Sequence, residues 1–127
     1  SARLPKPVVG AVSGHAFAGG AVLALACDAR IFAAGPFGFA LNEVNLGIML
    51  PPGVMRMAIA AAGHEAARRL LLEGQTFSPE QSLACGLAAA VVDPEQTLGK
   101  ALEHALMLGA KPAGAYALVK SSLLHFA

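Results

Sequence analysis

A glycine-rich turn is the part of this sequence with the clearest chemical potential. A Val-rich run at residues 8–12 ends at Ser13-Gly14, and Gly19-Gly20 then opens an apolar run at residues 21–27. The first run is typical of a buried strand and the second of a buried helix. The first amides of a helix have no internal partner and lie at the positive end of its dipole, so this turn aims N–H groups into a cleft. Such groups can hold a phosphate, a carboxylate or a developing oxyanion.

The residues around the turn exclude three familiar sites. A phosphate-binding P-loop needs Lys followed by Ser or Thr after its last glycine, whereas Ala21 and Val22 follow here. The interval between Gly14 and Gly19 does not match a dinucleotide-binding fingerprint. A serine-hydrolase elbow would need a nucleophile where Ala16 stands. Two interpretations remain: an oxyanion site without a covalent nucleophile, or glycines that serve only a tight turn and close helix packing.

Glu43 is an acidic residue in a strongly apolar setting, between residues 37–41 and the Gly- and Pro-rich segment 46–53. Partial burial among apolar side chains makes a carboxylate a stronger base, which suits it to general-base catalysis. The alternative is a solvated or capping residue in a loop. No other carboxylate of the sequence is well placed to pair with Glu43, so the pattern argues against chemistry that needs two carboxylates.

The histidines offer one candidate ligand contact and no metal site. His15 lies inside the glycine-rich turn, where it could touch a ligand or make a hydrogen bond with the backbone. The other histidines fall on expected helices without the i,i+4 spacing of a metal-binding pair. They are His64, His104 and His125.

The composition describes one domain, or part of one, with an apolar surplus. The chain has 127 residues, of which 56% are hydrophobic and 13% charged, so apolar surface is expected to contact further chain or neighbouring subunits. A net charge of +1 without a basic patch gives no support for nucleic-acid binding. No apolar run reaches the length of a membrane span without an interruption by Gly, Pro or charge. Cys27 and Cys85 are expected to be buried free thiols in a reducing compartment, which suits a cytoplasmic protein.

Hydrophobic periodicity and turn residues predict an alternation of short strands and helices. Ser78, Pro79 and Gln81 form the pattern of a capping box at the start of one helix. Asp28 and Arg30, between a helix and a strand, are interpreted as a cap and a salt bridge in preference to an acid and its partner. Strands are expected at residues 8–12, 31–34, 37–40 and 87–92. Helices are expected at residues 21–27, 54–62, 64–73, 79–85, 93–108 and 112–126, with a loop at residues 15–18.

Several consecutive segments of the sequence follow one known pattern. In this order they resemble the central signature of the crotonase (enoyl-CoA hydratase/isomerase) superfamily. The resemblance covers most of residues 5–93 and indicates a central-to-C-terminal portion of a longer protein. The segments are residues 6–14, 18–20, 23–30 and 41–48, with further matches at residues 67–74, 78–82, 85–87 and 91–93.

The resemblance implies an α/β (α+β) fold, namely a spiral of ββα turns followed by helices. Residues 1–93 would form part of the spiral core, and residues 94–127 would form a C-terminal helical region that mediates oligomerisation. Because the helices of the family mediate trimer formation, a homotrimer or hexamer is expected, without nucleic-acid or membrane partners.

The resemblance also implies a substrate and a site that stabilises an anion. The family binds acyl-CoA thioesters and stabilises their enolates with two backbone N–H groups, one of which matches Gly19 here. The neighbouring residues Ala18, Gly20, His15 and Phe17 become candidates for binding the substrate. In the family, the second donor and part of the coenzyme A pocket come from an earlier segment. The thioester is the substrate, and no further cofactor and no metal are expected.

The hydratases of the superfamily use two catalytic glutamates, and this chain is compared with them at these two positions. The first position holds Val22 and the second holds Glu43. One glutamate with an apolar residue at the other position resembles the 3,2-trans-enoyl-CoA isomerases, in which a single base moves a proton from C2 to C4. The expected function is therefore enoyl-CoA double-bond isomerisation in fatty acid metabolism, with weak or absent hydratase activity. The alternatives are another crotonase reaction, such as hydration, hydrolysis or decarboxylation, and a non-catalytic acyl-CoA-binding or assembly subunit.

Overall fold

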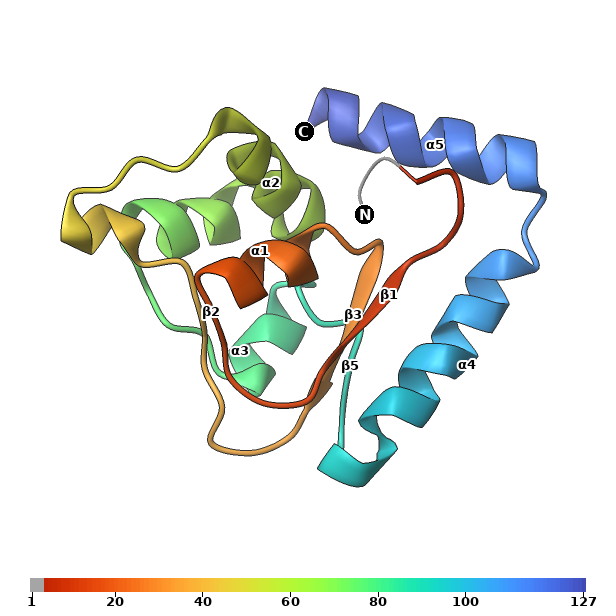
Figure 1. Cartoon of the computed structure of the whole chain (residues 1–127), viewed down its shortest axis with the longest axis horizontal. Coiled ribbons are helices and arrows are strands. Elements are labelled where there is room, and N and C mark those ends of the chain that lie inside the picture. Colours follow the sequence, from red (N-terminus) through yellow and green to blue (C-terminus); the bar gives the residue numbers. More distant parts are fainter. Residues whose placement is uncertain (1–3) are drawn as a thin grey trace.

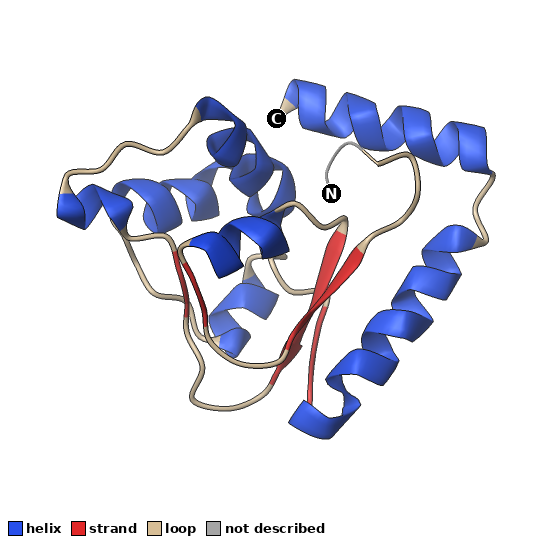
Figure 2. Ribbon diagram, in the orientation of Figure 1, coloured by secondary structure: helices blue, strands red, loops and turns tan. Residues whose placement is uncertain are grey.

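Short strands alternate with helices along the chain, and the computed structural model describes residues 4–127 (Figure 1 and Figure 2). The strands are β1 (Val9–Val12), β2 (Ala16–Phe17), β3 (Ala29–Ala33), β4 (Phe39–Ala40) and β5 (Ala90–Val92). The helices are α1 (Gly19–Leu25), α2 (Pro52–Ala67), α3 (Pro79–Ala84), α4 (Thr97–Gly109) and α5 (Ala113–Phe126). Three shorter turns are the 3-10 turns η1 (Glu43–Leu46) and η3 (Pro94–Gln96) and the π turn η2 (Arg68–Leu72). Figure 1 shows α2 and α4 on opposite sides of the central strands.

Both sheets are parallel. One has three strands in the order β1-β3-β5, with Val9 opposite Ala29 and Ile31 opposite Ala90. The other, which we call the small sheet, pairs β2 with β4 and places Phe17 opposite Ala40. Parallel neighbours need a crossover connection, and α1 lies in the one between β1 and β3. Because β2 leads directly into α1, the small sheet fixes the point where α1 begins.

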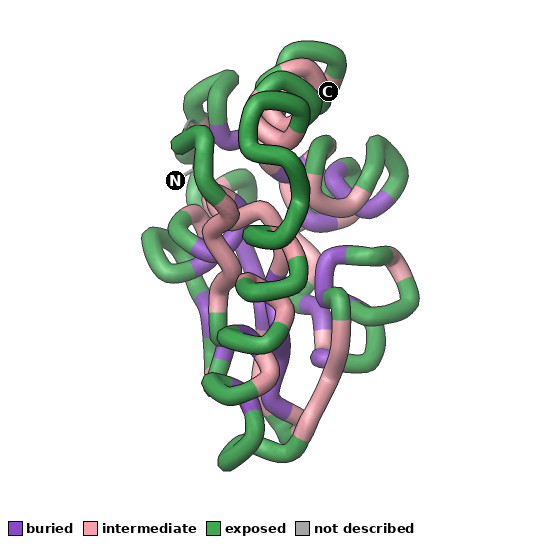
Figure 3. Tube along the Cα trace, turned by 90° about the vertical axis from the view of Figure 1, so that its right-hand side faces the viewer, coloured by how far each residue is buried: buried purple, intermediate pink, exposed green. Residues whose placement is uncertain are grey.

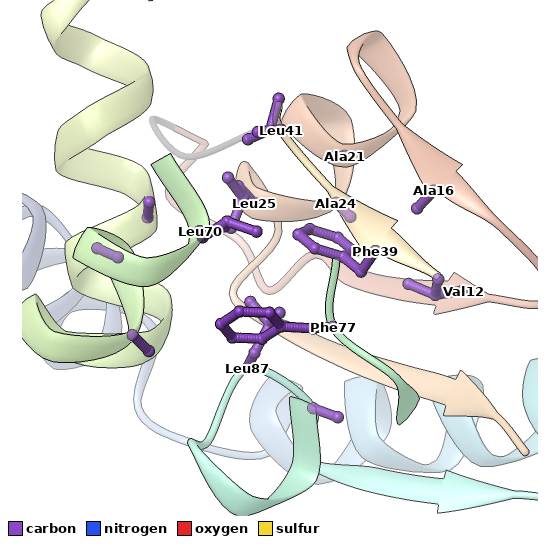
Figure 4. Packing of buried hydrophobic residues seen from close by; sticks show 14 of the residues in the cluster. Val12, Ala16, Ala21, Ala24, Leu25, Phe39, Leu41, Leu70, Phe77 and Leu87 are labelled. Carbon is purple, nitrogen blue, oxygen red and sulfur yellow. The ribbon is translucent and has the colours of Figure 1, made fainter. Parts of the chain in front are cut away.

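One buried cluster joins the small sheet to α1, α2 and η2. Phe39 and Phe77 are 1% exposed and Leu41 is fully buried, and Figure 4 shows them gathered with Leu25 and Leu70. Phe39 and Phe77 also exchange backbone hydrogen bonds (2.9 and 2.8 Å), which connect β4 to the segment before α3. Full burial of one large apolar side chain contributes roughly 1.5–3 kcal/mol. This core therefore holds β4 firmly in place.

The two C-terminal helices leave apolar faces on the outside of the molecule. α4 packs against β1 and β3, and α5 packs against α2. Figure 3 faces this side, where most turns of both helices are exposed. The exposed residues include Leu98, Leu102 and Leu106 on α4, and Leu118 and Leu123 on α5.

The strands differ from the sequence-based expectation at several boundaries. The strand expected at residues 31–34 is Ala29–Ala33, and the strand expected at residues 37–40 is only Phe39–Ala40. The loop expected at residues 15–18 is wrong in its middle, where Ala16–Phe17 form β2. Its pairing partner β4 lies far along the chain, so no local pattern announces this strand. The strand expected at residues 87–92 is only Ala90–Val92. The Leu87 carbonyl accepts from the Arg30 guanidinium instead (2.7 Å), which takes it out of the ladder.

The helices are confirmed with shifted boundaries. The helix expected at residues 21–27 begins earlier, at Gly19, and ends at Leu25. The break expected at residue 63, between helices at residues 54–62 and 64–73, is confirmed, because Gly63 within α2 has a non-helical φ of 83°. The second of these helices continues into η2. The helix expected from residue 93 begins with the turn η3 before α4. Within residues 4–127, no helix is both long and apolar enough to cross a membrane.

Two local predictions around α3 have different outcomes. The capping box is confirmed, because the Gln81 N–H donates to Ser78 Oγ (3.1 Å) and the Ser78 N–H donates to Gln81 Oε1 (2.9 Å). Cys27 and Cys85 are free thiols, as expected, but they are half-buried, not buried as expected. Each follows the end of a short helix, where the chain turns at the surface.

Candidate active site

Two parallel strands bring the sequence-predicted donor and base to one edge of the small sheet. β2 is followed by Ala18 and Gly19, and β4 is followed by Leu41 and then by Glu43 at the start of η1. The Ala18 N–H donates to the carbonyl of the last residue of β4 (3.3 Å), which holds the two segments together as they leave the sheet. Ala21 of α1 and Leu41 belong to one buried cluster (Figure 4), so each segment is also anchored in the core.

Ala18 has a backbone conformation that alanine rarely adopts. Its φ is 49° and its ψ is −118°, in the region of positive φ that favours glycine. Holding a non-glycine residue there costs roughly 1–3 kcal/mol, which the surrounding hydrogen bonds and packing must offset. Since ψ of Ala18 sets the plane of the next peptide bond, this strained residue determines the direction of the Gly19 N–H. Strain of this kind concentrates at functional sites.

The first turn of α1 leaves its amides and the space beside them open. Within residues 4–127, no side chain at the N-cap position satisfies these amides. A Cβ added to Gly19 or Gly20 would meet no described atom within 4 Å, and neither glycine has a positive φ. Gly10 differs, because a Cβ there would lie 3.1 Å from Cys27 Sγ. Close packing therefore explains Gly10, whereas Gly19 and Gly20 keep a space open.

Glu43 is half-buried, and one of its carboxylate oxygens is isolated. Oε2 is buried and makes no hydrogen bond within the described part of the chain. The turn η1 is held in shape by the Ile48 N–H, which donates to the Glu43 carbonyl (3.0 Å). Asn45 of the same turn lies so close to Gly74 that a Cβ there would be 2.6 Å from Asn45 Nδ2. An unpaired buried oxygen on a well-held turn costs free energy unless a ligand or a proton satisfies it.

Val22 lies on α1, at the position where the resemblance to the hydratases would imply a second glutamate. It is half-buried and packs against the core. Along residues 4–127, no group of three or more His, Cys, Asp or Glu side chains is arranged to hold a metal ion. The sheet edge thus combines one carboxylate with open backbone amides. Such a pair can transfer a proton while an N–H group stabilises negative charge on oxygen.

His15, Phe17 and Phe37 form a partly exposed aromatic cluster beside β2. The His15 ring stacks on Phe17 with centroids 5.2 Å apart and meets Phe37 edge-on at 5.6 Å. The Gly38 N–H donates to His15 Nδ1 (3.0 Å), so the backbone hydrogen bond considered from the sequence is present. Contact of His15 or Phe17 with a ligand stays a prediction.

A cavity of about 310 Å³ lies beside the glycine-rich turn. Its lining includes Gly14, His15 and Gly20. Neither Gly19 nor Glu43 is among the described residues that line it. Of the predicted residues, His15 and Gly20 line this cavity, whereas the predicted donor and base follow the ends of β2 and β4.

The sequence analysis missed an apolar surface next to Glu43. Val44, Leu46, Ile48 and Met49 are between 41% and 84% exposed. Exposed apolar side chains around a single carboxylate suit an apolar ligand. The signal in the sequence is that residues 44–50 are mainly apolar but lack the periodicity of a helix or a strand.

Asp28 and Arg30 lie at the other end of α1 and have structural roles. The guanidinium of Arg30 is buried, and its Nη1 donates to the carbonyls of Ala24 and Cys27 (3.0 and 2.8 Å), which caps the helix. Asp28 forms an ion pair with Lys120 (2.7 Å). The interpretation of the two residues as a cap and a salt bridge is confirmed.

Comparisons with known proteins agree with this architecture. The family model described as Enoyl-CoA hydratase/isomerase matches residues 2–127. Human enoyl-CoA delta isomerase 1, mitochondrial, is 37% identical over 117 residues, which are 91% of this chain and 39% of the human protein. The 2,3-dehydroadipyl-CoA hydratase of Escherichia coli K12 is 35% identical over 108 residues, which are 85% of this chain and 40% of that enzyme.

A solved structure extends the likeness to three dimensions. The crystal structure of human mitochondrial delta3-delta2-enoyl-CoA isomerase has a TM-score of 0.88 and 35% identity, and the match covers 96% of this chain and 48% of that one. The expected fold class and the crotonase resemblance are therefore confirmed. The chain spans less than half the length of these three relatives. The match of the family model over residues 2–127 shows that the chain belongs to the enoyl-CoA hydratase/isomerase family.

Proposed function

We propose that this chain carries the catalytic base and one oxyanion donor of an enoyl-CoA double-bond isomerase. Glu43 is the base, the Gly19 N–H is the donor, and the substrate is a 3-enoyl thioester of coenzyme A. The observation that carries the proposal is the isolated Glu43 Oε2 at the sheet edge that also bears the strained Ala18. Family membership and the name of the human relative support the same reaction class.

The reaction moves one proton and shifts the double bond by one carbon. Glu43 takes a proton from C2, and the C2–H electron pair forms the C1–C2 double bond of an enolate while the thioester oxygen becomes negative. The Gly19 N–H then donates a stronger hydrogen bond to that oxygen. Return of the proton from Glu43 to C4 restores the thioester carbonyl and leaves the double bond between C2 and C3. The reaction needs no oxidant, metal or cofactor besides the thioester substrate.

Val22 favours isomerisation over hydration. Hydration needs groups that position and deprotonate water and that protonate carbon, whereas the shift of a double bond needs one base. Val22 brings no second carboxylate to α1, and the apolar residues after Glu43, Leu46 and Ile48 among them, would exclude water from the acyl chain. The relatives are named both as isomerases and as a hydratase. The test therefore measures isomerase activity and hydratase activity on the same protein.

The outer faces of α4 and α5 support a second part of the proposal, assembly into a homotrimer or a hexamer of two trimers. Leu98, Leu102 and Leu106 follow one face of α4 and are 66%, 58% and 76% exposed. A continuous apolar face of this kind marks a protein–protein contact. Leu102→Glu is expected to shift the protein to monomers in sedimentation equilibrium, and an unchanged mass would reject this contact.

The test is migration of the double bond in a 3-enoyl-CoA, followed by NMR in deuterated water with the full-length gene product. We expect turnover with deuterium appearing at C2 or C4. Glu43→Gln should remove it, a loss of 100-fold or more being typical for a general base, while the thioester still binds. Glu95→Gln, which changes an exposed acid on η3, is the matched control and should keep full activity.

Three outcomes separate the alternatives. Unchanged turnover in Glu43→Gln would reject Glu43 as the base. Rapid addition of water to a 2-enoyl-CoA by the unmodified protein would make it a hydratase despite Val22. Binding of the thioester without turnover and without exchange of the C2 protons would favour a binding or assembly subunit.

A further inference from the structure

Gly38, just before β4, is held on both sides by the segment that leads into β2. The Gly38 N–H donates to His15 Nδ1 (3.0 Å), and the Gly38 carbonyl accepts from the Ala16 N–H (2.9 Å). The first of these bonds uses a side chain, and the second is part of the small sheet. Together they fix the start of β4 against the start of β2.

The aromatic cluster holds the His15 ring in the orientation that this bond requires. Phe17 stacks on one face at an interplanar angle of 22°, and Phe37 meets the ring at 89°. Gly38 allows this packing, because a Cβ there would lie 3.2 Å from the Phe17 ring and 2.7 Å from Thr76 Cγ2. Since Nδ1 accepts a hydrogen bond, the proton of the neutral ring is on Nε2.

The small sheet needs such support, because each of its strands has only two residues. A slip of one residue between short strands turns every side chain to the opposite face. Here it would bring the exposed Phe17 to the buried side and remove Ala16 from the core. It would also break the bond from the Ala18 N–H to the Ala40 carbonyl (3.3 Å), next to the candidate site.

We infer that His15 is a positioning residue for the oxyanion donor, acting through Gly38. By fixing the register of β2 against β4, it sets where Ala18 leaves one strand and where Glu43 follows the other. It thereby sets the direction of the Gly19 N–H relative to the base. The inference rests on the proposed function and deepens it, because it assigns a role to a residue outside the donor and base pair.

Three substitutions separate the hydrogen bond from the ring. His15→Phe keeps an aromatic ring against Phe17 but removes the acceptor. His15→Asn places an oxygen where Nδ1 lies, and His15→Gln places one where Nε2 lies. In the full-length protein we expect kcat to fall about tenfold in His15→Phe and His15→Gln, with KM changed less than threefold. His15→Asn should restore kcat to within threefold of the unmodified protein.

A spectroscopic measurement separates positioning from simple loss of structure. A hydrogen bond to the thioester oxygen lowers the carbonyl stretching frequency, which infrared difference spectra of bound 2-enoyl-CoA report. The shift should shrink in His15→Phe and His15→Gln and return in His15→Asn. Equal kcat and equal carbonyl shift in all variants would overturn the inference, even if all were less stable. If His15→Phe does not fold, the comparison of His15→Asn with His15→Gln carries the test, and equal behaviour of these two would also overturn it.

The outcomes for His15 and for the proposed function are distinguishable. A bound thioester with a shifted carbonyl but no isomerisation would reject the isomerase, while the three variants would still test the role of His15. If isomerisation is normal in the unmodified protein and kcat does not depend on an acceptor at residue 15, only the positioning role of His15 would be rejected. A bound thioester without any carbonyl shift would reject both the donor and its positioning residue.

Discussion

The two ends of α1 are built in opposite ways. At its N-terminal end Ala18 is strained, and no side chain among residues 4–127 caps the first amides. At its C-terminal end the buried guanidinium of Arg30 donates to Ala24 and Cys27, and its Nε also reaches the Leu87 carbonyl (2.7 Å). One end keeps its donors available, and the other has its acceptors satisfied. The helix is anchored in the core by Ala21, Ala24 and Leu25, and its side-chain capping hydrogen bonds within the described residues are all at the end away from the candidate site.

The electrostatics of the capped end explain why a cation is tolerated there. Burial lowers the pKa of Arg30, chiefly through desolvation, yet a guanidinium stays protonated at neutral pH. A positive charge at the C-terminus of a helix also interacts favourably with the helix dipole. Asp28, two residues before Arg30, is held by Lys120 (2.7 Å) and by the Tyr116 hydroxyl, which ties α5 to the same point.

The largest expected effect comes from breaking the capped end. Arg30→Met removes the donors of three carbonyls, and we expect the free energy of unfolding to fall by about 3 kcal/mol, since each buried group left unpaired costs roughly 1–3 kcal/mol. Urea unfolding of the full-length protein at neutral pH measures this loss. Arg56→Met, which replaces an exposed arginine on α2, should change stability by less than about 0.5 kcal/mol. Equal stability of the two variants would show that the cap contributes nothing.

The open end should respond in activity and hardly in stability. Gly19→Ala places a methyl group in the space beside the donor amide, so we expect kcat/KM for the isomerase reaction to fall on the order of 100-fold, as when an oxyanion donor is removed. The unfolding free energy should stay within about 1 kcal/mol, because the methyl group meets no described atom. Gly99→Ala, at an exposed position of α4 with similar open space, is the control. Full activity of Gly19→Ala would remove Gly19 from the site.

Relief of the strain at Ala18 should make the open end more stable and less active. Ala18→Gly relieves roughly 1–3 kcal/mol of strain but adds roughly 0.4–1 kcal/mol of chain entropy to the unfolded state. We therefore expect a net gain of about 1 kcal/mol in unfolding free energy. A several-fold decrease in kcat should accompany it, because the Gly19 N–H is aimed less firmly. A variant less stable than the original chain would contradict the strain at residue 18.

The same contrast shows which features a sequence can reveal. Features set by neighbours in the chain were predictable: the strand β1, the capping box of Ser78 and Gln81, and the open turn at Gly19. Features set by distant partners were not. β2 is a strand only because β4 pairs with it, and Arg30 caps α1 while also reaching Leu87, 57 residues away.

The candidate site divides in the same way. The apolar setting of Glu43 in the sequence suggested its proposed role, whereas the isolation of its Oε2 required the fold. The positive φ of Ala18 could not be predicted from the sequence, because alanine rarely adopts this conformation. The proposed donor and base could thus be named from the sequence and its resemblance, whereas their proposed alignment through His15 and the small sheet depends on tertiary contacts.

The smallest expected effect lies again at the capped end, where the Tyr116 hydroxyl donates to Asp28. Tyr116→Phe should lower the unfolding free energy by about 1 kcal/mol at pH 7, the usual contribution of one hydrogen bond. Partial burial and this bond raise the pKa of Tyr116 above its ordinary value of about 10. The stability that Tyr116 contributes is thus fully present below pH 10 and is lost as the pH rises through the raised pKa, because the unfolded chain ionises first. Urea unfolding should show the difference between the two proteins shrinking from pH 7 to pH 11, and a constant difference would contradict the assignment.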